Sequence, residues 1–487
     1  METNTGHTGS NDTEKLSFPS LAGYGIGDLF GGGSFVLIGA FYMFYLTQTV
    51  GLSPSTAGLI FALGKVWDAI SDPLMGALSD RTRSRFGRRR VFFLLAPVPV
   101  FLSFFMMWLP VSGGRDLTAL FYYGGSYLFF NTVFTMVMVP YSAINAEITS
   151  SYRERTRLSG ARMIFSQISA LLSATLPMLI ISASDRGYQI MAAVFGALYA
   201  SPWLIVFFST RENCPEEAPS PLSPGIVFKQ FISIFSNSSF RRLTGMYICA
   251  YTAMDIMMAL FIYVLTYSLN MKAHYSAAMG SLVITQLLML PLYVKLANRK
   301  GKGAAYRRGL IIWAGALSSV FLLNESSPVW MLVIICITIG SGEIAGVFVP
   351  WAVLPSVIDV DELICGDKRS GTYSGAMTMI RKMVQGLGAM PLVGFLLEMV
   401  GFREGGVVPE NLLPLKILFI LVPAGFILLG IFISLGFKIT PRTHSILSDE
   451  LTRLRDGGDK DLAKASVKEV CEELSGMGWE KLYPVKG

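Results

Sequence analysis

The chain has 487 residues, of which 52% are hydrophobic and only 15% charged, and its mean hydropathy is +0.52. Soluble proteins carry roughly 25% charged residues, so this composition predicts a polytopic membrane protein. The net charge of +7 fits Lys and Arg in cytoplasmic loops, and no nucleic-acid partner is expected. Five cysteines without a CxxC pair and three scattered histidines argue against disulfide scaffolds and metalloenzymes.

Apolar runs separated by polar breaks predict an all-α membrane protein with twelve transmembrane helices, since each span needs about 20 apolar residues. In the first half the runs lie at 21–46, 55–79, 91–111, 118–147, 158–183 and 188–209. In the second half they lie at 243–268, 274–297, 308–323, 329–358, 372–400 and 413–437.

A proline-containing segment at 210–240 interrupts this pattern and predicts a cytoplasmic linker. It divides the chain into an N-terminal six-helix bundle (1–209) and a C-terminal six-helix bundle (241–440). The remaining residues, 441–487, are expected to form a cytoplasmic tail that contains a short helix.

The distribution of positive charge predicts the orientation. Lys and Arg gather in the alternate loops 80–90, 150–157 and 295–308, so both termini are expected in the cytoplasm. Residues 1–17 lack the basic start and apolar core of a signal peptide. We expect a multi-pass protein of the plasma (inner) membrane that works as a monomer.

Three short sequence matches relate the two halves at offsets of 218, 210 and 215 residues. Residues 73–81 match 291–299, 139–143 match 349–353, and 159–161 match 374–376. Each match lies at the same place in its half, which predicts parallel repeats with a binding site between two six-helix bundles. Chance similarity of short apolar words is the alternative.

The second predicted helix carries two carboxylates one turn apart, Asp68 and Asp72, inside an apolar run. They share one helix face, and charges at such depth are costly and usually face a pathway. A bound cation, Na⁺ or H⁺, would relieve their repulsion. Alternatively, Lys65 neutralises the pair as an internal ion pair.

The loop after this helix contains a glycine, an Asp-Arg pair and a later Gly-Arg-Arg. It resembles the signature loop of the major facilitator superfamily and predicts a cytoplasmic gate made by Gly76, Asp80, Arg81 and Arg88. Gly76 is expected to permit close helix packing.

The segment from Trp67 to Pro73 resembles, more narrowly, the glycoside–pentoside–hexuronide:cation symporters typified by the melibiose carrier. Further marks of this resemblance are 24–27, 50–53, 139–142 and 379–382. The resemblance implies a cation site of Asp68, Asp72 and Thr135, which would be a metal site if the ion is Na⁺. It also places a lysine near that site, Lys382, and an arginine in the fifth helix, Arg162.

The chain departs from the melibiose carrier where that carrier's acids hold the sugar, because those positions fall on Gly32 and Met138. Asp28, one turn earlier, could present a carboxylate to the same cavity or be a plain helix-end acid. Gly32 could let substrate approach the backbone or let helices pack closely. Asp255, Glu343 and Arg381 could line the pathway or pair across helices as structural ion pairs. Tyr141 and Trp351, each beside a proline, could stack on a sugar ring or simply pack at a proline kink.

These features predict a secondary active symporter that imports a sugar or glycoside, possibly an anionic one, with Na⁺ or H⁺ by alternating access. A lysophospholipid symporter is the alternative, because those carriers share the Trp-Asp-Ala-Ile-x-Asp-Pro core and also lack the galactoside acids. No catalytic cluster or G-x-x-x-x-G-K-[ST] loop is present, so neither an enzyme nor an ATP-driven pump is expected. No cofactor beyond the coupling ion, and no partner beyond substrate, ion and bilayer, is implied.

Overall fold

The computed structural model describes residues 16–111, 117–148, 152–211, 231–367, 369–402 and 412–483. These residues form helices joined by turns, and they contain no β-strand. Most of predicted linker 210–240 lies outside the described residues.

The helices of the first half coincide with the six predicted apolar runs. They are α1 (Phe18–Gly25), α2 (Asp28–Leu37), the π-helical turn η1 (Ile38–Tyr42), α3 (Met43–Gln48), α4 (Pro54–Arg81), α5 (Arg90–Leu95), α6 (Pro97–Met106), α7 (Leu117–Ile148), α8 (Tyr152–Ser182), α9 (Gly187–Ala200) and α10 (Pro202–Ser209). Local sequence fixes several boundaries. In α4, Ser53 caps the helix by accepting from the Thr56 N–H, and Pro54 occupies the first turn, where no N–H is needed.

The helices of the second half likewise fall on their predicted runs. They are α12 (Ser238–Tyr263), η3 (Val264–Ser268), η4 (Lys272–His274), α13 (Tyr275–Lys300), α14 (Lys302–Ser319), η5 (Val320–Leu322), α15 (Val329–Cys365), α16 (Ser370–Met383), η6 (Val384–Ala389), α17 (Met390–Met399) and α18 (Leu412–Leu435). Asn237 caps α12 by accepting from the Phe240 N–H.

Among the described residues, nine helical segments are long and apolar enough to cross a membrane. The predicted runs 55–79, 91–111 and 308–323 are helical but are not among these nine. Charged residues lower the hydropathy of α4 and α14, and the run at 91–111 is divided at Pro97. Large apolar side chains such as Leu74, Phe208 and Phe432 are exposed on the outer helices, as expected of a surface that faces lipid.

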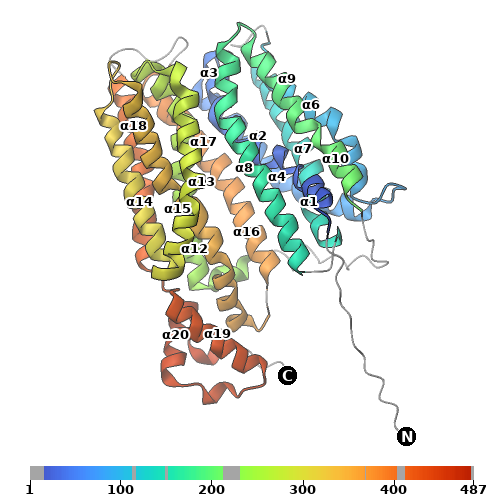
Figure 1. Ribbon diagram of the computed structural model, residues 1–487, viewed down its shortest axis with the longest axis vertical. Coiled ribbons are helices and arrows are strands. Elements are labelled where there is room, and N and C mark those ends of the chain that lie inside the picture. Colours follow the sequence, from blue (N-terminus) through green and yellow to red (C-terminus); the bar gives the residue numbers. More distant parts are fainter. Residues whose placement is uncertain are drawn as a thin grey trace.

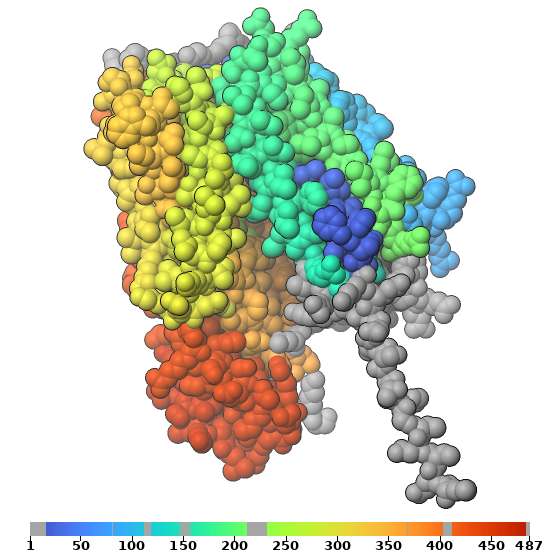
Figure 2. All heavy atoms as spheres, in the orientation of Figure 1, coloured from blue at the N-terminus to red at the C-terminus, as the bar shows by residue number. Residues whose placement is uncertain are grey.

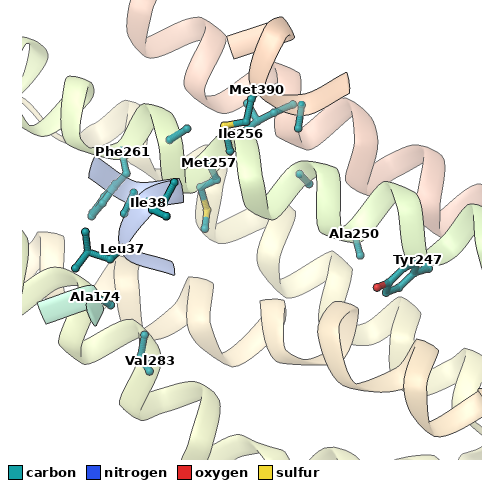
Figure 3. Packing of buried hydrophobic residues seen from close by; sticks show 14 of the residues in the cluster. Leu37, Ile38, Ala174, Tyr247, Ala250, Ile256, Met257, Phe261, Val283 and Met390 are labelled. Carbon is teal, nitrogen blue, oxygen red and sulfur yellow. The ribbon is translucent and has the colours of Figure 1, made fainter. Parts of the chain in front are cut away.

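The helices of each half pack mainly against helices of the same half (Figure 1). In the first half α2 packs on α8, α4 on α7 and α6 on α9, and in the second half α14 and α13 pack on α15 and α12 packs on α18. The halves meet where α4 contacts α17, α8 contacts α13, and η1 and α3 contact α12. Figure 3 shows Leu37 and Ile38 among Phe261, Met257 and Val283 at this junction.

The tail folds into a small helical unit whose buried apolar residues continue the hydrophobic core of the membrane helices. It contains α19 (Pro441–Arg455), η8 (Lys460–Leu462), α20 (Ala465–Ser475) and η9 (Trp479–Lys481), so the predicted tail helix is present and a second one follows it. The unit packs against one end of α12, α13 and α15 (Figures 1 and 2). We call this end of the molecule the tail side.

An ion pair and a second polar contact join the tail to the end of α15. Arg455 donates to both carboxylate oxygens of Glu362 at 2.6 Å, and His444 Nε2 lies 2.9 Å from Asp359 Oδ2. The tail is therefore held to the second half by side chains of α19.

Candidate functional site

A cavity of about 1080 Å³ lies between the two halves. Its walls come from α2, η1, α4 and α7 of the first half and from α12, α16, η6 and α17 of the second. The cavity reaches toward the tail side, because Ser142 near the end of α7 and Gly371 at the start of α16 line it. In Figure 2 the surfaces of α8 and α13 meet away from the tail, and α16 is set back below that contact.

Contacts between the halves close the opposite side. Thr47 and Tyr263 share a hydrogen bond of 2.7 Å between their hydroxyls, and Ser276 donates to the Thr175 carbonyl at 2.6 Å. A Cβ on Gly58 of α4 would lie 2.9 Å from Pro391 Cα of α17, so the two helices approach backbone to backbone. The described conformation is therefore accessible from the tail side and closed on the other.

Of the two acids of α4, Asp72 lines the cavity and Asp68 is buried beside it. Both are paired with lysines, which come from the two halves. Lys65 Nζ is 3.0 Å from Asp68 Oδ2, so the internal ion pair considered from the sequence does form. Lys382 of α16 lies 2.5 Å from Asp72 Oδ2 and 3.8 Å from Asp68 Oδ2. Thr135 of α7 donates to Asp72 Oδ1 at 2.7 Å. The structure thus brings together the predicted residues Asp68, Asp72, Thr135 and Lys382.

This cluster has the chemistry of a site for a small hard cation. Carboxylate and hydroxyl oxygens are hard ligands, and Asp68 Oδ1 is buried without a hydrogen-bond partner among the described residues. An unpaired buried carboxylate oxygen is costly, and a cation would satisfy it. No group of three or more His, Cys, Asp or Glu side chains that could hold a metal occurs in the described part of the chain.

A glycine positions the buried lysine of the cluster. Lys65 is buried, and its aliphatic stem lies against Gly386 of the π-helical turn η6, where any Cβ would collide with it. Its ammonium also lies 4.3 Å from the centre of the Phe35 ring. The predicted run 372–400, which forms α16, η6 and α17, therefore contacts the acids of α4 through Lys382 and contacts Lys65 through the π-helical turn η6.

A second charged group faces the cavity from the second half alone. Arg381 donates to Asp255 through both terminal nitrogens, at 2.5 and 2.7 Å, and Gln385 donates to the same carboxylate at 3.2 Å. The guanidinium carbon lies 4.8 Å from the centre of the Tyr251 ring, and Tyr251 accepts a hydrogen bond from Trp351 at 3.2 Å. Asp255, Arg381 and Gln385 line the cavity, whereas Trp351 is not among its lining residues.

The other residues proposed for substrate lie behind the wall. Asp28 pairs with Arg162, with Nε 3.1 Å from Oδ2, and Tyr141 is buried against that guanidinium at 4.4 Å. A Cβ on Gly32 would lie 2.7 Å from Ser166 Cα, so this glycine serves helix packing. None of these four residues lines the cavity.

The predicted gate residues lie on the tail side, at the end of α4 and in the loop that follows. Arg81 is exposed and Arg88 is half-buried, while the side chain of Asp80 lies outside the described residues. No described side chain comes within 4 Å of a Cβ placed on Gly76, so the expected close packing at this glycine was wrong for this conformation.

Two amide residues that contact the charged groups were missed by sequence reasoning, and of these only Gln385 lines the cavity. Asn131 accepts from Lys65 at 3.5 Å, and Gln385 contacts Asp255. Neither amide stands out in an apolar helix, although Gln385 lies one turn after Arg381 and this spacing was the available signal.

A charged cavity between the two halves of a helical membrane protein is typical of a transporter. A sequence model of the family described as MFS/sugar transport protein matches residues 23–441. The chain therefore belongs to this family of the major facilitator superfamily, and the resemblance to cation symporters seen in the sequence is confirmed.

Relatives and solved structures agree with this assignment. The chain is 30% identical to the uncharacterized symporter sll1374 of Synechocystis, over 91% of this chain and 98% of the relative. It is 27% identical to a putative sulfoquinovose importer of Salmonella typhimurium (94% and 98%) and 23% identical to the sodium-dependent lysophosphatidylcholine symporter 1 of Gallus gallus (88% and 87%). The crystal structure of the nucleoside transporter NupG superposes with a TM-score of 0.59 at 14% identity (86% and 98%), which indicates a shared fold.

Proposed function

We propose that this protein is a secondary active symporter that couples a sugar or glycoside to Na⁺ or H⁺ by alternating access. The observation that carries the proposal is the cluster of Asp68, Asp72 and Thr135, which Lys382 reaches from the other half of the molecule. A family of sugar transporters and symporter relatives support the same function.

In this proposal the chain has twelve spans arranged as two six-helix bundles, 1–209 and 241–440, joined by the linker 210–240. The tail side is the cytoplasmic side of the plasma (inner) membrane, in keeping with the basic loops, and the transporter works as a monomer. The described conformation is then inward-open. Gly76, Asp80, Arg81 and Arg88 belong to the cytoplasmic gate that closes when the bundles rock.

We infer that Lys382 acts as a tethered cation. In the empty carrier its ammonium neutralises Asp72 and lies near Asp68, so the two acids are not left unpaired in the membrane interior. A coupling cation that binds the acids must displace the ammonium toward the cavity. Because the lysine belongs to the second half, this exchange changes the contact between the bundles.

A lysophospholipid is the second candidate substrate. The cavity wall includes the apolar side chains of Phe35, Phe134, Met138, Met254 and Met258, which could receive an acyl chain. A relative named as a lysophosphatidylcholine symporter favours the same possibility. Polar side chains near the same cavity, including Ser374 and Thr378, suit sugar hydroxyls.

Proteoliposome counterflow tests the proposal. Labelled glycosides, uronides and lysolipids are each supplied with and without a Na⁺ gradient, and again with a pH gradient. We expect a sugar derivative to accumulate against its gradient only when one of the cation gradients is present. Accumulation of lysolipids alone would favour the second candidate, and sugar uptake that ignores both cation gradients would contradict coupling.

A further inference from the structure

The two halves carry a repeated group of residues that the sequence matches described above do not include. A Tyr-x-x-x-Asp sequence occurs at 24–28, in α1 and α2, and again at 251–255 in α12. In each half the aspartate pairs with an arginine, Arg162 of α8 or Arg381 of α16. The Arg162 guanidinium lies over the ring of Tyr141 of α7, whereas the Arg381 guanidinium lies over that of Tyr251 itself. The chain therefore contains two versions of one Arg–Asp–Tyr arrangement.

The two versions differ in which edge of the arginine is occupied. Asp28 accepts from Nε and Nη2 of Arg162, which uses the edge nearest the aliphatic stem. Asp255 accepts from Nη1 and Nη2 of Arg381, which uses the far end and leaves Nε without a hydrogen-bond acceptor among the described residues. An arginine carries five N–H donors in a fixed fork. Nε and the outer hydrogen of Nη2 thus form a second donor pair on Arg381.

Only the second version faces the cavity. Arg381 and Asp255 line the cavity, whereas Asp28 and Arg162 do not. Asp255 is nearly covered, at 5% exposed, and it is held by Gln385 as well. Asp255 therefore fixes the guanidinium, and the free donor pair remains available to a ligand.

The charges around the cavity balance in the empty carrier. The lining residues include three positive side chains, Lys65, Arg381 and Lys382, and two negative ones, Asp72 and Asp255. Asp68, which is buried beside them and pairs with Lys65, makes the count even. Adding one coupling cation leaves a net charge of +1 in a low-dielectric site, where an unbalanced charge is costly. A ligand with one negative charge restores neutrality.

We propose that Arg381 binds the single anionic group, a carboxylate or sulfonate, of a sugar acid carried with one coupling cation. The proposal rests on the symport function above and names its substrate class. The cavity is neutral both in the empty carrier and in the carrier that holds cation and anion, so both forms can change between the inward-open and the outward-open conformation. Carriers loaded with only cation or only anion hold an unbalanced charge, which gives obligatory coupling.

The test compares neutral and anionic substrates that differ at one position. Purified protein in proteoliposomes is offered methyl glucosides and galactosides, each beside its methyl uronide and its 6-sulfonated 6-deoxy counterpart, under an inward Na⁺ gradient and then a proton gradient. We expect half-saturation at least tenfold lower for an anionic member than for its neutral partner. Uptake of the anion should not respond to an imposed membrane potential, because one positive and one negative charge move together.

Variants assign the preference to Arg381. Arg381→Gln should weaken anion binding about 10- to 100-fold, since hydrogen bonds to charged groups are lost, while affinity for the neutral partner changes less than threefold. Arg381→Lys, which keeps the charge but loses the fork, should fall between. The double variant Asp255→Asn/Arg381→Gln removes both charges and guards against misfolding caused by an unpaired acid. Arg162→Gln makes the same change in the first-half version. It should leave the ratio between the affinity for the anionic substrate and that for its neutral partner as in the parent.

The outcomes separate this proposal from the symport function. Three results would overturn the role of Arg381 and leave symport intact. The first is cation-driven uptake that prefers neutral glycosides, and the second is anion uptake driven by membrane potential. The third is a preference for the anion that stays unaltered in Arg381→Gln and in the double variant. Failure of every sugar and sugar acid would overturn the substrate class. Uptake of an anion without any cation dependence would overturn the proposed symport itself.

Discussion

Replacing Lys382 by glutamine should make the carrier bind its coupling cation more tightly. The ammonium lies 2.5 Å from Asp72 Oδ2 and 3.8 Å from Asp68 Oδ2, which is where a cation would bind. Two positive charges about 4 Å apart repel by about 4 kcal/mol at an effective dielectric constant of about 20. Movement of the ammonium into the cavity relieves part of this repulsion, so we expect a net gain of about 1.4–2.8 kcal/mol, or about 10- to 100-fold in Na⁺ affinity.

Direct binding of ²²Na⁺ to purified protein at pH 8 measures this affinity. Uphill accumulation should be lost at the same time, because the empty Lys382→Gln carrier holds an unbalanced carboxylate and returns poorly. The double variant Asp255→Asn/Arg381→Gln is the control, since it removes one positive and one negative charge that pair with each other rather than with the α4 acids, and it should change Na⁺ affinity less than threefold. Unchanged or weaker Na⁺ binding in Lys382→Gln would refute the tethered-cation role.

Two further variants test the closure and the tail. Gly58→Leu forces α4 away from the α17 backbone and should open the side opposite the tail, which would raise the labelling of cysteines placed there. Gly425→Leu is the control, because a Cβ at this glycine meets nothing within 4 Å, and it should leave the labelling unchanged. Arg455→Gln removes the partner of Glu362, and because the arginine is half exposed, the loss is about 0.5–1.5 kcal/mol. Burial raises the pKa of the Cys471 thiol to about 12, so maleimide should label this cysteine slowly at pH 8 in the parent. Labelling should be about two- to tenfold faster in Arg455→Gln, where the tail is held less firmly. Equal rates would show that the Arg455–Glu362 pair does not hold the tail.

Much of the fold could be predicted because long apolar runs admit few structures in a membrane. Every predicted run is helical, including 55–79, which carries Lys65, Asp68 and Asp72 and is not among the nine apolar segments. The division of 91–111 at Pro97 could not be seen in hydropathy alone. The twelve-span count and the two bundles stay predictions.

The acid cluster could be predicted because it is local in sequence. Two carboxylates one turn apart share a helix face wherever the helix lies. The partner that completes the cluster is remote, since 310 residues separate Lys382 from Asp72, and only the resemblance indicated it. The sequence did not decide whether Asp28 and Asp255 face the cavity, because the helix face that meets the cavity depends on packing. In the structure Asp28 pairs with Arg162 behind the cavity wall, whereas Asp255 lines the cavity.

Uphill transport by the Asp72→Asn carrier tests the central claim most directly. Asp72 contacts Lys382 and Thr135, and its loss removes an oxygen charge that a coupling cation needs. Parent and variant proteoliposomes are compared for accumulation under a cation gradient and for exchange of labelled against unlabelled substrate at equal concentrations. Coupling through the α4 acids predicts that accumulation is lost while exchange persists, and a variant that concentrates substrate as well as the parent would contradict it.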